Sequence, residues 1–579
     1  MTTQPIRRLD TDILILGAGG AGLLAALHAK KRAPELAVTV AVKGLLGKCG
    51  CTRMVQGGFN VALAPGDSLE RHFMDTIEGG KWLNDQDLAW TLVVGAQVRI
   101  RELENEWGCF FDRNPDGSIH QKAFAGQSFD RTVHKGDLTG IEIMNRLAEQ
   151  VWARGILRLE EHRAVALVPE AGGAGIAGVL MIDMRSGGFA FVRAKAVLLA
   201  TGGGPTMYRY HTPSGDKSCD GMAMALEAGL ALRDMEMVQF HPTGLLAGHD
   251  TRMTGTVLEE GLRGAGGWLL DRDGQRFMAE YDAKAERATR DVVSRAMIDQ
   301  IRRGRGTGLG GLYLEMSQLG PERVRKEFKG MVERCADCGF DLAGGRVEVI
   351  PTAHYMMGGV SFEKDCRTAI PGLFAAGEDT GGVHGANRLG GNGVANSTVF
   401  GGIAGESMAD WIKAGAGFRA VDEDRVAAGV SRATQPFQLP AGHSSEIESV
   451  REKLYEVMWE DVGVLREERG LRRAEAALPE LDQRLDRVGF GAAAPGFNLA
   501  WHDWLNLKNL ILVSRAITAA ALARQDSAGA HFRTDYPGTA VPDSARFTCV
   551  HLREDGLILT SEPVRFTRVR PGQSLLAVA

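Results

Sequence analysis

A glycine fingerprint near the N-terminus is the part of the sequence whose spacing most directly indicates chemistry. Gly17, Gly19 and Gly22 form a Gly-x-Gly-x-x-Gly motif between an apolar run and an alanine-rich segment. In such a motif the first glycine makes a tight turn, the second lets a pyrophosphate approach, and the third permits close helix packing. The N-terminus of the helix then faces the anion. The motif therefore predicts a dinucleotide site.

These glycines can bind a dinucleotide only if a strand precedes them and a helix follows. Residues 12–16 are a short apolar run, which is typical of a strand buried on both faces of a parallel sheet. Residues 21–30 are rich in Ala and Leu, and residues 38–42 predict the next strand, so the three segments make one βαβ unit. An acidic residue is expected after the second strand of an NAD site. Lys43 stands after Val42 instead, which favours FAD over NAD.

The rest of the chain shows how the site is framed. The buried-strand pattern returns at residues 191–200 and 372–377, and between them the region 239–352 loses this rhythm and is interpreted as an inserted domain. Apolar residues at helical spacing predict a further set of helices. These helices are expected at 88–103, 447–465 and 509–524.

Length and composition restrict the class of protein. At 579 residues the chain is too long for one hydrophobic core, so about two to four domains are expected. A formal charge of -5 gives no basic footprint for nucleic acid, which we exclude as a partner. The eight cysteines are scattered, which indicates a reducing compartment and favours the cytoplasm.

Two short motifs are not interpreted as functional sites. Cys335 and Cys338 form a Cys-x-x-Cys, but no second pair or His lies at zinc spacing, so no metal site is predicted. Arg7 and Arg8 precede an apolar stretch, as in a twin-arginine export signal. Because that stretch carries the glycine motif, we expect it to be part of the fold and not a removable peptide.

Further motifs occur in an order and at spacings that resemble one family over nearly the whole chain. The chain is similar to the flavoproteins of succinate dehydrogenase, fumarate reductase and L-aspartate oxidase. The similarity is carried by the glycine motif and by Cys51-Thr-Arg-Met-Val-Gln-Gly-Gly58, Ala200-Thr-Gly-Gly203, Asp220-Gly221, Gly377-Glu378 and the C-terminal stretch 527–537.

The resemblance implies an α/β fold in which a Rossmann-like FAD-binding domain is split by an inserted α+β capping domain and followed by a helical C-terminal domain. The expected bounds are 1–238 and 353–435 for the two parts of the FAD-binding domain, 239–352 for the capping domain, 436–535 for the helical domain and 536–579 for a C-terminal tail.

The same resemblance implies a set of residues that hold FAD. In the family the glycines hold the pyrophosphate, and an Asp and a Glu sit against the cofactor. The residues at the matching positions are Gly17, Ala18, Gly19, Gly22, Lys43, Cys51, Thr52, Gln56, Gly57, Gly58, Ala200, Thr201, Gly202, Asp220, Glu378, Arg388 and Asn392.

Chemistry on a dicarboxylate needs cations for both carboxylates, a flavin that exchanges hydride at one carbon, and a proton donor at the other. The resemblance places these roles on motif-like strings of His, Arg and Glu residues. A lone Arg or His is usually a surface or structural residue, but here they occur together. By the family match His241, His354 and Arg388 bind carboxylates, Arg290 is the acid/base, and Glu260 and Arg263 relay the proton.

Two positions depart from the family pattern. Where membrane complexes usually have a His that bonds covalently to the flavin, this chain has Cys51, so noncovalent FAD is the simpler expectation and a thioether the alternative. Where the family has a carboxylate-binding Thr, this chain has Glu259. Two adjacent carboxylates in a poorly hydrated site repel each other unless one is protonated or turns away. We expect Glu259 to tune substrate choice.

Phe124 separates the branches of the family, because L-aspartate oxidases carry at this position a Glu that receives the substrate ammonium. The expected function is succinate–fumarate interconversion by a flavoprotein subunit. Such a subunit docks an iron-sulfur protein, through which it can reach a membrane anchor at the inner face of the cell membrane. The alternatives are an L-aspartate oxidase of NAD synthesis and a flavin-binding electron-transfer or scaffold subunit without dicarboxylate turnover.

Overall fold

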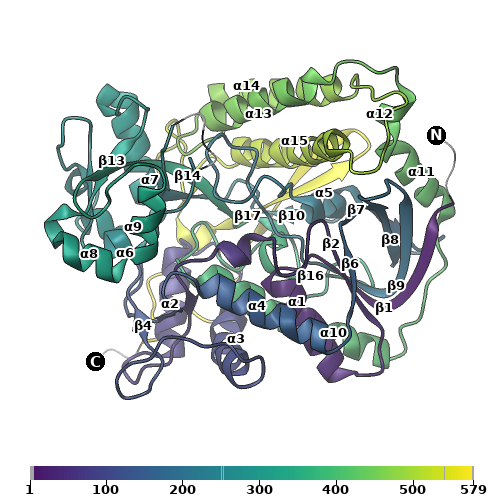
Figure 1. Ribbon diagram of the computed structural model, residues 1–579, viewed down its shortest axis with the longest axis horizontal. Coiled ribbons are helices and arrows are strands. Elements are labelled where there is room, and N and C mark those ends of the chain that lie inside the picture. The colour runs from purple at the N-terminus through teal and green to yellow at the C-terminus, as the bar shows by residue number, and fades with distance from the viewer. Residues whose placement is uncertain (1–4, 249–250, 252, 540, 577–579) are drawn as a thin grey trace.

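A seven-stranded sheet carries the glycine motif at the end of its strand β1 (Figure 1). The computed structural model describes residues 5–248, 251, 253–539 and 541–576. The strand order is β6-β2-β1-β9-β8-β7, and β16 also pairs with β9. β1, β2, β6, β9 and β16 are parallel, whereas β7, β8 and β9 form an antiparallel meander. The bounds are β1 (Arg7–Leu16), β2 (Val38–Val42), β6 (Leu157–Glu160), β7 (His162–Pro169), β8 (Ile176–Asp183), β9 (Phe189–Leu199) and β16 (Leu373–Ala375).

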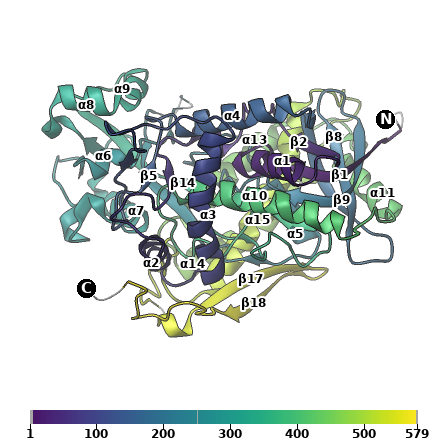
Figure 2. The same cartoon turned by 90° about the horizontal axis from the view of Figure 1, so that it is seen from below.

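The C-terminal part of strand β1 is buried on both faces, and its alternating side chains enter two different cores. Ile13 and Ile15 pack into a core with helices α1 (Gly20–Arg32) and α10 (Asn392–Lys413), which lie side by side in Figure 2. Leu14 and Leu16 pack into the opposite core, with α5 (Asp220–Glu227) and α15 (Leu499–Ala523). Because successive side chains of a strand point to opposite faces, this is a layered α/β arrangement. The predicted Rossmann-like fold class is confirmed.

The predicted βαβ unit forms as expected, but the strand is longer than predicted and begins at Arg7. Arg8 lies in this strand and pairs with Glu423 at 2.6 Å. The helix expected at 88–103 is α3 (Gln86–Asn105), which begins after Asp85, whose side chain accepts the N–H groups of the first turn. α3 packs against α2 (Leu69–Gly79) and α10, whereas α4 (Thr139–Ala153) packs against α1. A small separate sheet has the order β3 (Phe59–Asn60), β5 (Thr132–Val133), β4 (Gln121–Lys122).

The inserted region has a sheet and a hydrophobic core of its own. Its antiparallel strand order is β11-β14-β13-β12. A separate core cluster lies between Leu245 and Val349 in sequence. This part, which we call the cap segment (239–352), occupies the left side of Figure 1. Its elements are β11 (Val238–Leu245), α6 (Gly261–Gly264), β12 (Trp268–Leu270), α7 (Arg290–Gln300), β13 (Leu312–Glu315), α8 (Pro321–Glu327), α9 (Lys329–Ala336) and β14 (Arg346–Met356). The domain bounds themselves stay a prediction.

The helical part differs in detail from the prediction. The helix expected at 447–465 is α13 (Ser445–Asp461), which ends four residues earlier, and a second helix, α14 (Glu468–Leu485), follows it without having been predicted. α15 is longer than expected and is the one described helix long and apolar enough to cross a membrane. Its buried face packs against α13 and α14, as a core helix does. The shorter helices α11 (Glu423–Ala433) and α12 (Gln435–Gln438) precede α13.

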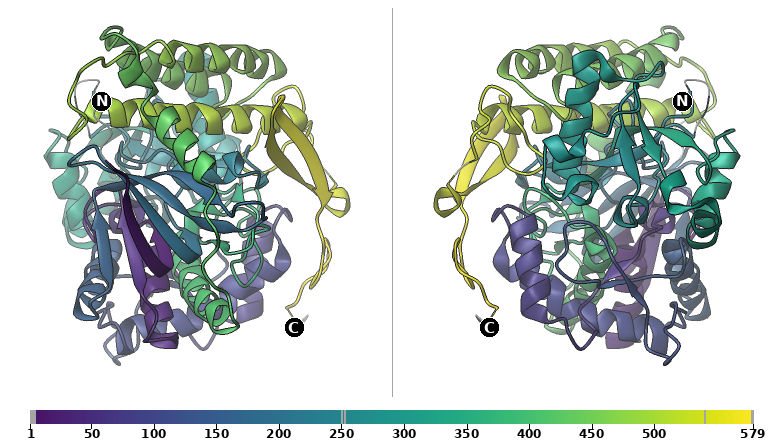
Figure 3. Two further views of the ribbon diagram at one scale, coloured as in Figure 1. Left: turned by 90° about the vertical axis from the view of Figure 1, so that its right-hand side faces the viewer. Right: turned by 90° about the vertical axis from the view of Figure 1, so that its left-hand side faces the viewer.

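The C-terminal tail folds back onto the FAD-binding half. Residues Arg546–Arg553 form β17, which pairs with β18 (Gly556–Pro563) in a hairpin that projects from one side of the molecule in Figure 3. On its other edge β17 pairs with β10 (Leu232–Arg233), which in turn pairs with β15 (Gly359–Val360). Residues far apart in sequence are thereby tied into one sheet.

Candidate active site

One cavity of about 660 Å³ runs from the glycine motif to the cap segment. Its walls come from the end of β1, the short helix η1 (Cys51–Met54), the segment after β9, the turn at Glu378 and several cap residues. Nearly all the residues expected to act therefore face the same space. Those that line it are Gly17, Ala18, Gly19, Lys43, Cys51, Thr52, Gln56, Gly57, Gly58, Phe124, Ala200, Thr201, Gly202, Asp220, His241, Glu259, Glu260, Arg290, His354, Glu378 and Arg388.

The three motif glycines play three different steric roles. Gly17 has a φ of +110°, and a Cβ there would overlap the carbonyl of Ala200. A Cβ on Gly22 would overlap the carbonyl of Gly17, so this residue serves helix packing and does not line the cavity. At Gly19 the nearest atom to an added Cβ is Thr52 Oγ1, at 3.6 Å. The backbone is thus open to the cavity at the second glycine, which is where a pyrophosphate needs to approach. The residues fit an FAD.

A charged cluster fixes the wall beyond the motif. Lys43 Nζ donates to Asp220 Oδ2 at 2.8 Å, and Arg163 donates to Asp220 Oδ1 at 3.0 Å. Burial would raise the pKa of Asp220, but these two cations outweigh it and hold that pKa well below its usual value. Burial also lowers the pKa of Lys43, despite the nearby carboxylate. Asp220 and Lys43 therefore hold each other in place at the cavity wall, as an ion pair that the sequence did not reveal.

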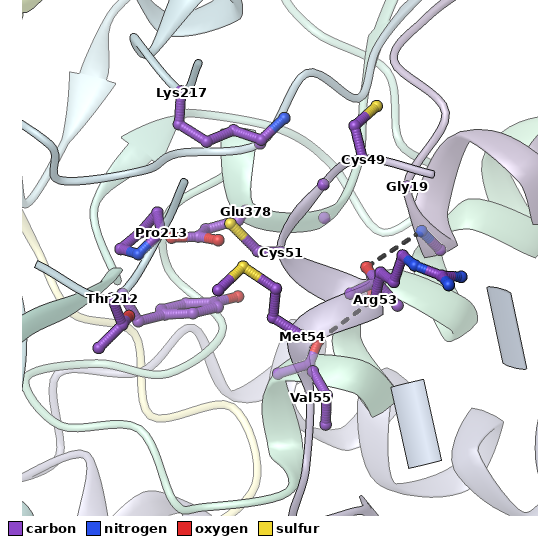
Figure 4. Close-up of a pocket in the computed structure, with 18 of the residues that line it drawn as sticks. Gly19, Cys49, Cys51, Arg53, Met54, Val55, Thr212, Pro213, Lys217 and Glu378 are labelled. Atoms are coloured by element: carbon purple, nitrogen blue, oxygen red, sulfur yellow. Dashed lines mark hydrogen bonds between the residues drawn. The ribbon is translucent and has the colours of Figure 1, made fainter. Parts of the chain in front are cut away.

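Cys51 lies where the covalent His of related proteins is expected. Figure 4 shows Cys51 and Met54 pointing to the side of the cavity on which Glu378 lies, with Lys217 nearby. Burial, followed by the charge of Glu378, raises the pKa of Cys51 to about 12. Burial likewise raises the pKa of Glu378 to about 7, although its Oε1 accepts the N–H of Met356 at 3.0 Å. At neutral pH Cys51 is therefore a thiol and not the nucleophilic thiolate.

Arg290, Glu260 and Arg263 form a continuous chain inside the cap segment. Glu260 Oε2 accepts Nη2 of Arg290 at 2.6 Å and Nε at 3.0 Å, and its Oε1 lies 3.4 Å from Arg263 Nη2. Burial would raise the pKa of Glu260, but the charges of Arg290 and Arg263 outweigh it and lower that pKa. Arg290 faces the cavity, whereas Arg263 lies behind Glu260 and donates to the carbonyl of Glu286 at 2.6 Å. The three side chains thus form a bonded series that leads from the cavity into the cap segment.

His241, His354 and Arg388 meet at the same end of the cavity. The two imidazole centroids are 5.4 Å apart, and His354 Nδ1 bonds to Thr212 Oγ1 at 2.8 Å. His241 Nδ1 faces the N–H of Thr243 at 3.3 Å. Burial, followed by the charge of Arg290, holds the pKa of both imidazoles well below the usual value, so both are neutral. A neutral imidazole has one N–H that can donate to a carboxylate.

Arg388 is a buried cation whose donors are largely unused within the described residues. Its Nε has no hydrogen-bond partner there, and Nη1 makes only a 3.4 Å contact to the carbonyl of Leu389. The guanidinium lies 4.3 Å from the centroid of the Tyr355 ring, and burial followed by the charge of Arg290 lowers the pKa of Arg388 to about 10. A buried, charged and unsatisfied donor at a cavity wall is suited to an anionic ligand.

The conflict expected between Glu259 and Glu260 is avoided by a residue that the sequence analysis missed. Lys122 Nζ lies 3.1 Å from Glu259 Oε2, so the second carboxylate neither turns away from the cavity nor stands unpaired. The ammonium of Lys122 also lies 5.8 Å from the centroid of Phe124. Glu259 thus lines the cavity as half of an ion pair.

Besides Gly22, one further residue predicted to hold the cofactor does not line the cavity. Asn392 is the first residue of α10, and its side chain bonds to Asn60, His72 and Thr76 in a buried network. Its expected contact with the cofactor stays a prediction. Other cavity residues were not predicted, because no motif marks them: Arg163, Lys217 and Arg334.

Comparison with known proteins agrees with this geometry. Residues 12–394 match the family described as FAD binding domain, and residues 451–575 match fumarate reductase flavoprotein C-term. The chain is 40% identical over 540 residues to a subunit of the fumarate reductase (CoM/CoB) of Methanothermobacter marburgensis, covering 92% of this chain and 95% of that protein. It is 37% identical over 541 residues to the 8-methylmenaquinol:fumarate reductase flavoprotein subunit of Wolinella succinogenes, covering 91% and 86%.

A solved structure is similar over the whole chain. An E. coli quinol fumarate reductase chain superposes with a TM-score of 0.92 at 32% identity and covers 98% of this chain and 99% of its own. Together the layered α/β fold and the cavity define an FAD-dependent oxidoreductase. The chain belongs to the fumarate reductase and succinate dehydrogenase flavoprotein family.

Proposed function

We propose that this chain interconverts succinate and fumarate as the flavin-bearing subunit of a larger complex. The observation that carries the proposal is the buried, unsatisfied guanidinium of Arg388 beside Arg290 and two neutral histidines. These groups supply donors for two carboxylates at one end of a cavity whose other end fits FAD.

A bound FAD would supply the hydride chemistry at one central carbon of the dicarboxylate. The residues proposed to hold it are the motif glycines, the segment 51–58, Ala200 to Gly202, and the pair of Lys43 with Asp220. His241, His354 and Arg388 orient the carboxylates. Closure of the cap segment over the cavity excludes water.

Arg290 is proposed to give the proton to the second central carbon during fumarate reduction and to remove it in the reverse direction. The usual pKa of arginine exceeds ~12, so this role needs a carboxylate that takes part in the proton transfer. Glu260 is in place, with 2.6 Å between its Oε2 and Nη2 of Arg290. Arg263 then continues the relay away from the cavity, although it does not line the cavity itself.

A turnover assay tests this function against its rival. Purified holoenzyme with a chemically reduced electron donor should reduce fumarate, and it should form no hydrogen peroxide from L-aspartate. Aspartate-dependent peroxide without fumarate reduction would favour an L-aspartate oxidase instead. Absence of both activities, in protein that retains FAD, would favour an electron-transfer or scaffold subunit.

We further propose that FAD is held without a covalent bond, because Cys51 is a buried thiol whose pKa is raised to about 12. Acid precipitation should release all the flavin into the supernatant. Flavin that remains in the washed pellet, with a thioether on the peptide around Cys51 in mass spectrometry, would contradict the proposal. Without the covalent bond we expect a lower flavin potential than in His-linked relatives, which favours fumarate reduction.

The partner is proposed to be an iron-sulfur subunit that delivers electrons to the flavin. Support comes from the relatives, which are named as subunits of reductases whose names give different electron donors, CoM/CoB and 8-methylmenaquinol. We propose that the complex is cytoplasmic and can attach through this subunit to the inner face of the cell membrane. Isolation of the native complex, with iron analysis of its components, tests this partner. A flavoprotein that purifies alone from gently lysed cells would contradict it.

A further inference from the structure

We call the part of the cavity near His241, His354 and Arg388 the substrate end, and the part near the glycine motif the nucleotide end. On the cap side of the substrate end, both carboxylates are paired with cations. Glu260 lies between Arg290 and Arg263, and Glu259 faces Lys122 at 3.1 Å. Another carboxylate of the cavity, Glu378, lies near Cys51. Among the described residues, the cap side of the substrate end therefore presents donors to an anion and offers no free carboxylate to a cationic group.

The pair of Lys122 and Glu259 joins two parts of the chain that are far apart in sequence. Lys122 ends β4 in the small sheet with β5 and β3, outside the cap segment, whereas Glu259 lies in the cap segment just before α6. The side chain of Glu259 is 6% exposed and that of Lys122 is 21% exposed, so the pair is screened from bulk solvent. It connects the cap segment to β4 at the edge of the cavity.

We propose that Lys122 is a specificity-determining residue that acts through Glu259. The ammonium of Lys122 neutralises the negative charge that Glu259 would otherwise present to a dianionic substrate. Because Glu259 is already paired with Lys122, it is not available to bind the ammonium group of an amino-bearing substrate. The site is thereby reserved for dicarboxylates without an ammonium group. This inference rests on the dicarboxylate function proposed above.

Substitutions of Lys122 and of Glu259 should change the affinity for a dicarboxylate in opposite directions, because each leaves the other residue with an unpaired charge. Without Lys122, Glu259 is an uncompensated anion that repels a dicarboxylate and attracts an ammonium. Without the Glu259 carboxylate, Lys122 is an uncompensated cation that attracts a dicarboxylate. A purely structural contact between two segments predicts something else, namely that either variant loosens the site and raises KM.

The test uses the holoenzyme with Lys122→Met, Glu259→Gln and the double variant. Lys122→Met should raise KM for fumarate by about tenfold or more, Glu259→Gln should lower it by about threefold, and the double variant should lie close to wild type. The matched control is the exposed pair Lys329–Glu333 on α9, where Lys329→Met and Glu333→Gln should leave KM unchanged. An increase in KM for both Lys122→Met and Glu259→Gln would overturn the proposal.

A second measurement asks about the ammonium group directly. In Lys122→Met the inhibition constant of L-aspartate, relative to that of succinate, should fall by about tenfold or more, since Glu259 becomes available to the ammonium. An unchanged ratio would overturn the proposal. If Lys122→Met does not fold, the direction of the KM change in Glu259→Gln decides alone.

Failure of the proposed function gives a different result. In that case wild-type holoenzyme neither reduces fumarate nor oxidises succinate. Calorimetric binding of succinate and L-aspartate to the oxidised holoprotein then replaces the kinetics. A shift of preference toward L-aspartate in Lys122→Met still supports the role of Lys122, and an unchanged preference rejects it.

Discussion

The two ends of the cavity are built by different means. At the nucleotide end the decisive features belong to the backbone: a turn with positive φ at Gly17, an open approach at Gly19 and a close helix contact at Gly22. At the substrate end the decisive features are charged side chains from distant segments, such as Arg290 and Arg388. Binding at a site made of backbone is lost when an atom is added to that backbone. Binding at a site made of charged side chains depends instead on which charges neutralise each other.

This difference predicts that the largest loss of turnover comes from a substitution at the substrate end, even one that keeps the charge. Arg290→Lys keeps a cation but loses the planar guanidinium that bonds twice to Glu260. Turnover should fall by well over tenfold, which corresponds to more than ~1.4 kcal/mol in the barrier, while FAD stays bound. Steady-state kinetics and the flavin content of the purified protein measure both effects.

Arg295→Lys is the matched control for this change. Arg295 lies on the same helix, donates to the carbonyl of Gly529 and does not line the cavity. The Arg295→Lys variant should retain nearly full turnover. If Arg290→Lys also keeps more than about a tenth of wild-type turnover, Arg290 is not the proton donor.

At the nucleotide end, a single added methyl group should be enough to weaken FAD binding. Gly19→Ala places a Cβ where the described chain leaves 3.6 Å to the nearest atom, so the protein should fold with an unchanged Tm when FAD is absent. The methyl group fills the approach to the backbone, so FAD affinity should fall by about tenfold or more. Flavin fluorescence titration measures the affinity. Gly417→Ala, at an exposed position with open space around it, is the control. Unchanged FAD affinity in Gly19→Ala would place the pyrophosphate elsewhere.

The smallest expected effect concerns pH. Burial and nearby arginines hold the pKa of His241 and His354 well below the usual value of about 6.5, so neither imidazole gains a proton between about pH 6 and pH 8. KM for fumarate should then change by less than about twofold over that range. Imidazoles that titrate normally would become charged as the pH falls, and KM would decrease. Such a decrease, lost in His354→Asn, would show that His354 is a titrating cation.

The same contrast explains what the sequence could predict. The strand–glycine–helix unit is local, so residues 12–42 were enough to predict it, and the structure confirms it. The helix α14 was missed, and α13 ends before Leu465, because apolar spacing alone does not mark where one helix stops. The roles at the substrate end came from the family resemblance and stay predictions.

Charge compensation was the part that sequence reasoning could not reach. Glu259 was recognised as an unusual neighbour of Glu260, yet its partner Lys122 lies 137 residues away and belongs to no motif. Arg163 compensates Asp220 in the same way across 57 residues. The side chain of Asn392 is likewise bonded to a residue far away in sequence, Asn60. Such contacts follow from the fold and not from spacing.

A single-turnover reaction tests whether the flavin of this protein delivers its electrons to fumarate. The holoenzyme, reduced anaerobically and freed of excess reductant, is mixed with one equivalent of fumarate while the visible absorbance of the flavin is followed. We expect rapid return of the oxidised flavin spectrum together with formation of one equivalent of succinate. A flavin that stays reduced in the presence of fumarate, in protein whose FAD content is full, would contradict the proposed interconversion of succinate and fumarate.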